Sequence, residues 1–122
     1  MAVLQLDPAS GGPIAYLGTF LLASVFYGVT AFIAARYVLG AVPLLRALVV
    51  GAVLAAVSLL LQQFGPAVVI PVTVAADFVA IQQVFDLELR PTALVTVIHF
   101  TVAVILGITI FNLIRLLATA PG

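Results

Sequence analysis

Asp77 and His99 are the residues of this sequence that could carry out acid–base chemistry inside an apolar chain. Asp77 lies within a long apolar stretch, where a carboxylate costs about 2.5–3.5 kcal/mol to insert into a bilayer. His99 is the single histidine of the chain. Because an imidazole titrates near neutral pH, an Asp–His pair could exchange a proton. The two side chains are therefore the first candidates for a buried polar or relay site.

Residue counting places these side chains at a similar depth. At about 1.5 Å of rise per residue, Asp77 and His99 lie roughly 12 Å and 10 Å from a turn expected at 86–91. The same rise puts Tyr27 roughly 13 Å into its own segment. Thr73 lies one helical turn from Asp77 on the same face. We expect these four residues to form one polar layer, with Asp77 and His99 within hydrogen-bond reach on adjacent antiparallel helices.

This polar layer has three possible roles. It can be satisfied polar packing that fixes helix register, since hydrogen bonds between membrane helices are modest but common. It can be a proton or ion relay, because ionisable residues inside a membrane are functional candidates. Asp77 can also contact a partner subunit. No metal site is expected, because one histidine and scattered acids give no ligand spacing. No cofactor motif and no catalytic motif is present.

Composition restricts the class of protein. Of the 122 residues, 66% are hydrophobic and only 7% are charged, whereas soluble domains carry about 25% charged residues. The formal net charge is zero, and without an arginine cluster a nucleic-acid partner is not expected. There is no cysteine, which excludes disulfides and thiolate chemistry. These features predict an integral membrane protein that is not an enzyme and whose surroundings are the lipid bilayer.

Four apolar stretches can each reach the roughly 20 residues that cross a bilayer. They are continuous rather than alternating, which argues against β-barrel strands. The sequence therefore predicts an all-α fold, an integral membrane four-helix bundle formed as a single transmembrane domain over 1–122. An alternative has three spans, with the second and third stretches forming a re-entrant pair. The expected helices cover 14–36, 44–64, 66–85 and 92–117.

The arginines near the segment ends predict the orientation. With four spans, Arg36, Arg46 and Arg90 lie on one side of the membrane, and Arg115 lies on the other. Cytoplasmic loops carry an excess of basic residues. We therefore expect a multi-pass protein of the cell membrane with loops 36–46 and 86–91 in the cytoplasm and both termini outside.

Small residues recur at helical spacing and predict close helix packing. Such stripes let helix backbones approach each other when lipid removes the hydrophobic driving force between helices. They predict packing within one chain, a homo-oligomer or a contact with a partner membrane subunit equally well. The stripes contain Gly28 on the first segment, Gly51 and Ala55 on the second, and Ala103 and Gly107 on the fourth.

Three stretches carry a resemblance to a known family. They are the opening GGPIAYLGTFLLASVFYGVTAFIAARYVLG, the central AAVSLLLQQ with VTVAADF, and the ending HFTVAVILGITIFNL with its TAPG terminus. Together they resemble a family of small, uncharacterised four-helix membrane proteins from halophilic archaea. The resemblance implies a location in the membrane, and it implies no activity because the family has none assigned.

Two functional hypotheses follow. The first is a structural or accessory membrane protein with a buried polar layer around Asp77. The alternative is a small proton- or ion-coupled transporter or channel that acts as a homodimer, because four helices enclose little room for a pathway. Water access to Asp77 separates the two, since a transporter must expose this side chain and a structural role keeps it sealed.

Overall fold

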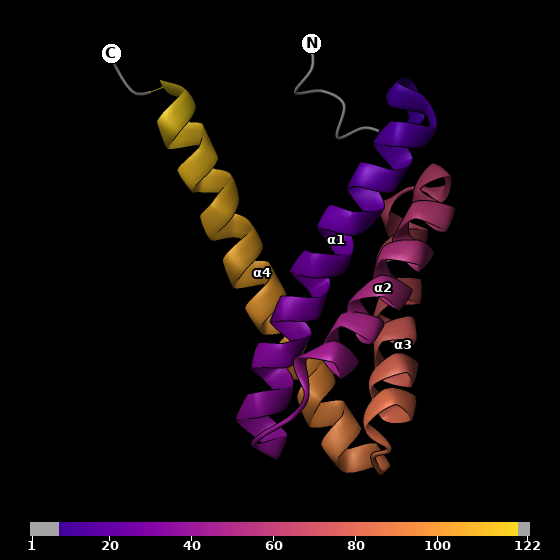
Figure 1. Cartoon of the computed structure of the whole chain (residues 1–122), viewed down its shortest axis with the longest axis vertical. Helices are drawn as coiled ribbons and strands as arrows, with labels where there is room; N and C mark the ends of the chain where they lie inside the picture. The colour runs from indigo at the N-terminus through magenta and orange to yellow at the C-terminus, as the bar shows by residue number, and fades with distance from the viewer. Residues whose placement is uncertain (1–7, 120–122) are drawn as a thin grey trace.

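The protein consists of four α-helices in the computed structural model, which describes residues 8–119 (Figure 1). They are α1 (Pro8–Leu39), α2 (Leu44–Leu61), α3 (Pro66–Phe85) and α4 (Leu89–Thr119), and a short 3-10 turn, η2 (Gln62–Phe64), follows α2. Each of the four helices is long and apolar enough to cross a membrane. The predicted all-α membrane four-helix bundle is confirmed.

The helix boundaries follow from glycine and proline positions. Gly65 has φ 85° and its N–H donates to the Gln62 carbonyl over 3.2 Å, so the chain reverses there and α3 begins at Pro66. A tight hairpin therefore joins α2 and its 3-10 turn to α3. Gly40, with φ 89°, follows α1, and its N–H donates to the Arg36 carbonyl over 3.0 Å. A positive φ costs glycine little because it has no Cβ atom.

Two helices start earlier than the sequence indicated. α1 begins at Pro8, and the break expected before residue 14 is reduced to one non-helical residue, Gly12, with φ 75° and ψ −160°. α4 begins at Leu89 and includes Pro91 in its first turn. Proline is tolerated there because the first amides of a helix have no partner within the helix.

α1 and α2 make the closest helix contact of the bundle. Gly28, Gly51 and Ala55 are buried where the two helices cross. A Cβ atom on Gly51 would collide with the Ser24 carbonyl oxygen and the backbone nitrogen of Gly28, and would lie 2.7 Å from the Gly28 Cα. Glycine is therefore required at position 51, since two backbones meet there without space for a side chain.

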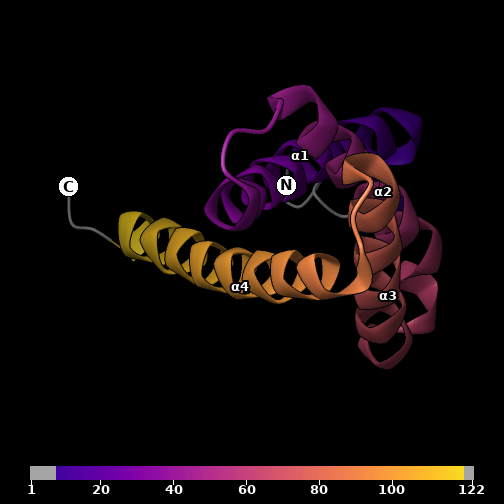
Figure 2. The same cartoon turned by 90° about the horizontal axis from the view of Figure 1, so that it is seen from below.

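α4 leaves the bundle after its first half, so the bundle is less compact than expected. Figures 1 and 2 show its C-terminal half diverging from α1, and it runs away from α2 and α3. Ala103 and Gly107 are only half-buried. A Cβ atom on Gly107 would have a single neighbour, the Phe26 ring at 3.9 Å. Within one chain Ala103 and Gly107 therefore do not form a close packing face, because α1 and α4 separate at this level. Packing of this face against a second copy or a partner subunit stays a prediction.

The contrast between the two glycines gives the first prediction. Gly51→Ala should destabilise the protein by about 1–3 kcal/mol, because overpacking forces the backbones apart. Gly51→Leu should destabilise it further, because its side chain is larger. Gly107→Ala is the matched control and should leave stability unchanged or raise it slightly, since alanine favours a helix. The measurement is the thermal unfolding midpoint in detergent. Equal midpoints for the two alanine variants would contradict the assigned contact.

Candidate functional site

Asp77 on α3 and His99 on α4 form a buried hydrogen-bonded pair. The distance between Asp77 Oδ2 and His99 Nδ1 is 2.7 Å. Asp77 is 0% exposed and His99 is 2% exposed, so both side chains lie away from the solvent-accessible surface. The predicted hydrogen bond between these two antiparallel helices is therefore present.

Thr30 on α1 occupies the other side of the imidazole. Its Oγ1 lies 2.8 Å from His99 Nε2, and its side chain is 0% exposed. We call Thr30, His99 and Asp77 the polar triad. The triad connects three helices, because the imidazole of α4 bonds to α1 through one nitrogen and to α3 through the other.

One arrangement of the triad protons follows when the Thr30 hydroxyl donates to its own helix. Its hydroxyl lies 3.0 Å from the carbonyl oxygens of both Phe26 and Tyr27 on its own helix. A hydroxyl has one proton to donate. When that proton goes to a carbonyl, the Thr30 oxygen accepts the Nε2–H of His99. Nδ1 and Asp77 Oδ2 then share one proton between them.

A shared proton makes the pair neutral overall. It is either an imidazole with a carboxylic acid or an imidazolium with a carboxylate, and neither carries a net charge. An unpaired charge inside an apolar bundle is costly. Both arrangements therefore suit a triad that is sealed from water.

The buried polar side chains of the described residues are concentrated around the triad. They come from α1, α3 and α4, and none comes from α2. On α4, a stripe of polar residues leads from the α3–α4 connection toward His99. The full set is Thr30, Thr73, Asp77, Thr92, Thr96 and His99.

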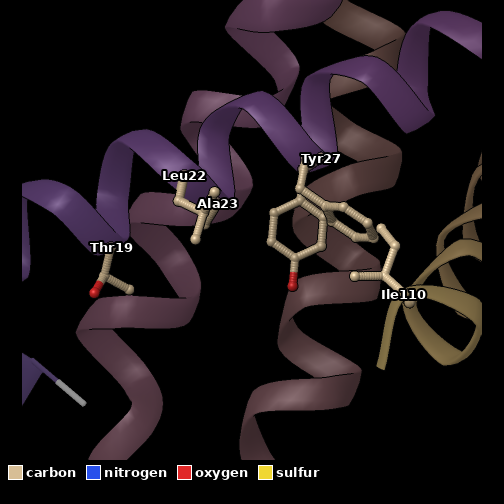
Figure 3. A pocket seen from close by; sticks show the side chains of 7 residues that line it. Thr19, Leu22, Ala23, Tyr27 and Ile110 are labelled. Carbon is tan, nitrogen blue, oxygen red and sulfur yellow. The ribbon is translucent and has the colours of Figure 1, made fainter. Parts of the chain in front are cut away.

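Tyr27 and Thr73 do not complete the triad as expected. The Tyr27 carbonyl accepts a hydrogen bond from Thr30, but its ring lines a cleft of about 380 Å³ between α1 and α4. Figure 3 shows the Tyr27 hydroxyl pointing away from α1 on this side, with Ile110 of α4 nearby. Thr73 is 6% exposed, and its hydroxyl has no hydrogen-bond partner among the described residues.

Sequence reasoning missed Thr30, although a signal for it exists. Counting back from Arg36 at about 1.5 Å per residue puts Thr30 at roughly 9 Å, nearer to the roughly 10 Å of His99 than Tyr27 is. The depth count therefore favours Thr30 over Tyr27 as the α1 partner of His99.

The described residues hold no group of three or more His, Cys, Asp or Glu side chains that could bind a metal ion. Fold and site together define a small protein of four potential membrane spans with one sealed polar triad. The chain belongs to a family of unknown function, DUF7473, which matches residues 10–121. Comparisons with curated proteins and with solved structures find no match.

The geometry of Thr30 gives the second prediction. Thr30→Val keeps the shape of the side chain but leaves the Nε2–H of His99 without an acceptor. It should lower the free energy of unfolding by about 1–3 kcal/mol, the cost of an unsatisfied buried polar group. Thr30→Ser should retain most of the stability.

Thr101→Val is the matched control for this measurement in detergent. The Thr101 hydroxyl also donates to its own helix, to the Val97 carbonyl over 2.9 Å, but it is exposed. Removing it should change the free energy of unfolding little. If Thr30→Val and Thr101→Val have the same effect, the triad does not contribute to stability.

Proposed function

We propose that this protein is a non-enzymatic, structural or accessory membrane protein in which the polar triad fixes the relative positions of α1, α3 and α4. The supporting observation is the seal around the triad, since each of its three side chains is at most 2% exposed and each comes from a different helix. A sealed site offers no substrate access.

The triad fixes the relative positions of the three helices because its hydrogen bonds are directional. Lipid removes the hydrophobic driving force between membrane helices, so packing and hydrogen bonds must set their register. Sliding α4 by one turn, about 5.4 Å, would take His99 out of reach of both Asp77 and Thr30. Apolar contacts alone would tolerate such a shift far better.

We place the protein in the cell membrane with both termini outside. The resemblance to membrane proteins of halophilic archaea supports this location. The α1–α2 and α3–α4 connections lie at the same end of the bundle (Figure 1), the end near Arg36, Arg46 and Arg90. Basic residues favour the cytoplasmic side, and only Arg115 lies toward the opposite end.

A second candidate function is a small proton- or ion-coupled transporter or channel that acts as a homodimer. One observation favours it: Asp77 Oδ1 is buried and has no hydrogen-bond partner within residues 8–119. A carboxylate kept only to fix helix register gains nothing from a free oxygen, whereas a proton or ion carrier uses it. Transport by the wild-type protein separates the two functions.

The orientation can be tested with single cysteines, because the natural chain has none. A membrane-impermeant thiol reagent added outside the cell should label Ala9→Cys and should not label Glu88→Cys until the membrane is permeabilised. Labelling of the Glu88 position alone from outside would reverse the proposed orientation.

The structural role is tested at Asp77. Asp77→Asn should fold normally, because a carboxamide both donates and accepts and can pair with Nδ1 in either protonation state. Asp77→Leu should lower the free energy of unfolding by about 1–3 kcal/mol, because Nδ1 then has no partner. Unfolding in detergent measures both variants.

Proton flux into proteoliposomes under an imposed pH gradient should be the same for the wild type and for Asp77→Asn. A wild-type flux that the asparagine variant abolishes, without loss of stability, would replace the structural proposal with the transporter.

A further inference from the structure

The face of α3 that carries Asp77 and Thr73 contains two unpaired polar atoms. Asp77 is 0% exposed and Thr73 is 6% exposed. Residues four apart on a helix have Cβ atoms about 5–6 Å from each other. Asp77 Oδ1 and Thr73 Oγ1 both lack a hydrogen-bond partner among the described residues. An unpaired buried polar group lowers the stability of the fold, so a hydrogen-bond partner for either atom would be stabilising.

Thr73 differs from the other buried threonines. Thr30, Thr92 and Thr96 each donate to the backbone carbonyl four residues earlier, over 3.0, 2.6 and 2.8 Å. Thr73 makes no such bond, so its hydroxyl proton remains available to another acceptor. Asp77 Oδ1 supplies the complementary property, because it accepts and has no donor.

We propose that one water molecule binds between Thr73 Oγ1 and Asp77 Oδ1. Such a molecule accepts from the hydroxyl and donates to the carboxyl oxygen, which satisfies both atoms. A buried water needs two to four polar partners, and this face provides two.

The charge of the Asp77–His99 pair favours a water molecule over a cation as the ligand of this face. When the Asp77–His99 pair shares one proton it is neutral overall, and a bound cation would then leave a net positive charge in the apolar bundle. Two oxygen atoms are also few for a metal cation, since hard cations such as Ca²⁺ take about six to eight. A neutral molecule that both donates and accepts hydrogen bonds can pair with the Thr73 hydroxyl and with Asp77 Oδ1.

The bound water extends the triad into a longer hydrogen-bonded chain. The order is water, Asp77, His99, Thr30, and the water is the proton partner of the Asp77–His99 pair. Protons of the buried imidazole therefore exchange with bulk water through the Thr73 end. A competing route runs along α4, where Thr96 and Thr92 lead to the α3–α4 connection. This inference goes beyond the structural function and does not depend on it.

The single histidine makes the test direct. In protein labelled with ¹⁵N-histidine, the imidazole N–H signals belong to His99 alone. Their exchange after transfer to D₂O is measured relative to the His99 backbone amide, which corrects for opening of the whole bundle. Wild-type protein should also show magnetisation transfer between water and the proton shared by Nδ1.

Thr73→Val should slow the imidazole exchange by about fivefold, the factor for one hydrogen bond of typical net strength. Thr73→Ser should restore the wild-type rate, and the exposed control Thr101→Val should keep it. The unfolding midpoints of the variants report separately on the structural role.

Three results would overturn the water site. One is the absence of magnetisation transfer from water in the wild type. Another is slower exchange in Thr96→Val but not in Thr73→Val, which would place the proton route on α4. The third is a sodium-dependent shift of the His99 signals that Thr73→Val removes, which would assign the site to a cation.

Discussion

The hydrogen bond between Asp77 and His99 is the interaction on which this fold depends. A carboxylate in an apolar span must be paired or neutralised, and this chain has one histidine to pair with it. The pairing joins α3 to α4, and Thr30 joins both to α1. α2 contributes no buried polar side chain within the described residues, and it is held by backbone contact at Gly51 instead. The bundle thus combines one polar connection with one region of close apolar packing.

The fold and the Asp77–His99 pair could be predicted because they depend on the lengths of the apolar stretches and on the number of residues from a shared turn. Apolar runs of sufficient length predict the helices, and residue counts from a shared turn bring Asp77 and His99 to one depth. Thr30 was missed because a threonine that bonds its own helix resembles ordinary packing in sequence. Ala103 and Gly107 do not pack closely within the chain, because a small residue permits two helices to approach each other without requiring it. Whether two helices meet at these residues depends on their crossing angle, and the local sequence does not predict that angle.

The two ends of the bundle differ in how closely their helices pack. The half that contains the α1–α2 and α3–α4 connections, which is the lower one in Figure 1, also contains the triad, whose side chains come from three helices. The upper half of α4 contacts little else, and residues 108–119 are exposed throughout. The cleft beside Tyr27 lies where these halves meet. The polar triad therefore sits at the point from which α1 and α4 diverge.

The unequal helix lengths make the shape of the protein sensitive to bilayer thickness. α4 has 31 residues and α2 has 18, which correspond to lengths of about 46 Å and 27 Å. A hydrocarbon core of about 30 Å matches α2 but is shorter than α4, and a helix longer than the core tilts. In a thicker bilayer α4 would need less tilt and would lie nearer to α1, whereas a thinner one would spread the two helices apart. We therefore expect lipid chain length to change the width of the cleft beside Tyr27.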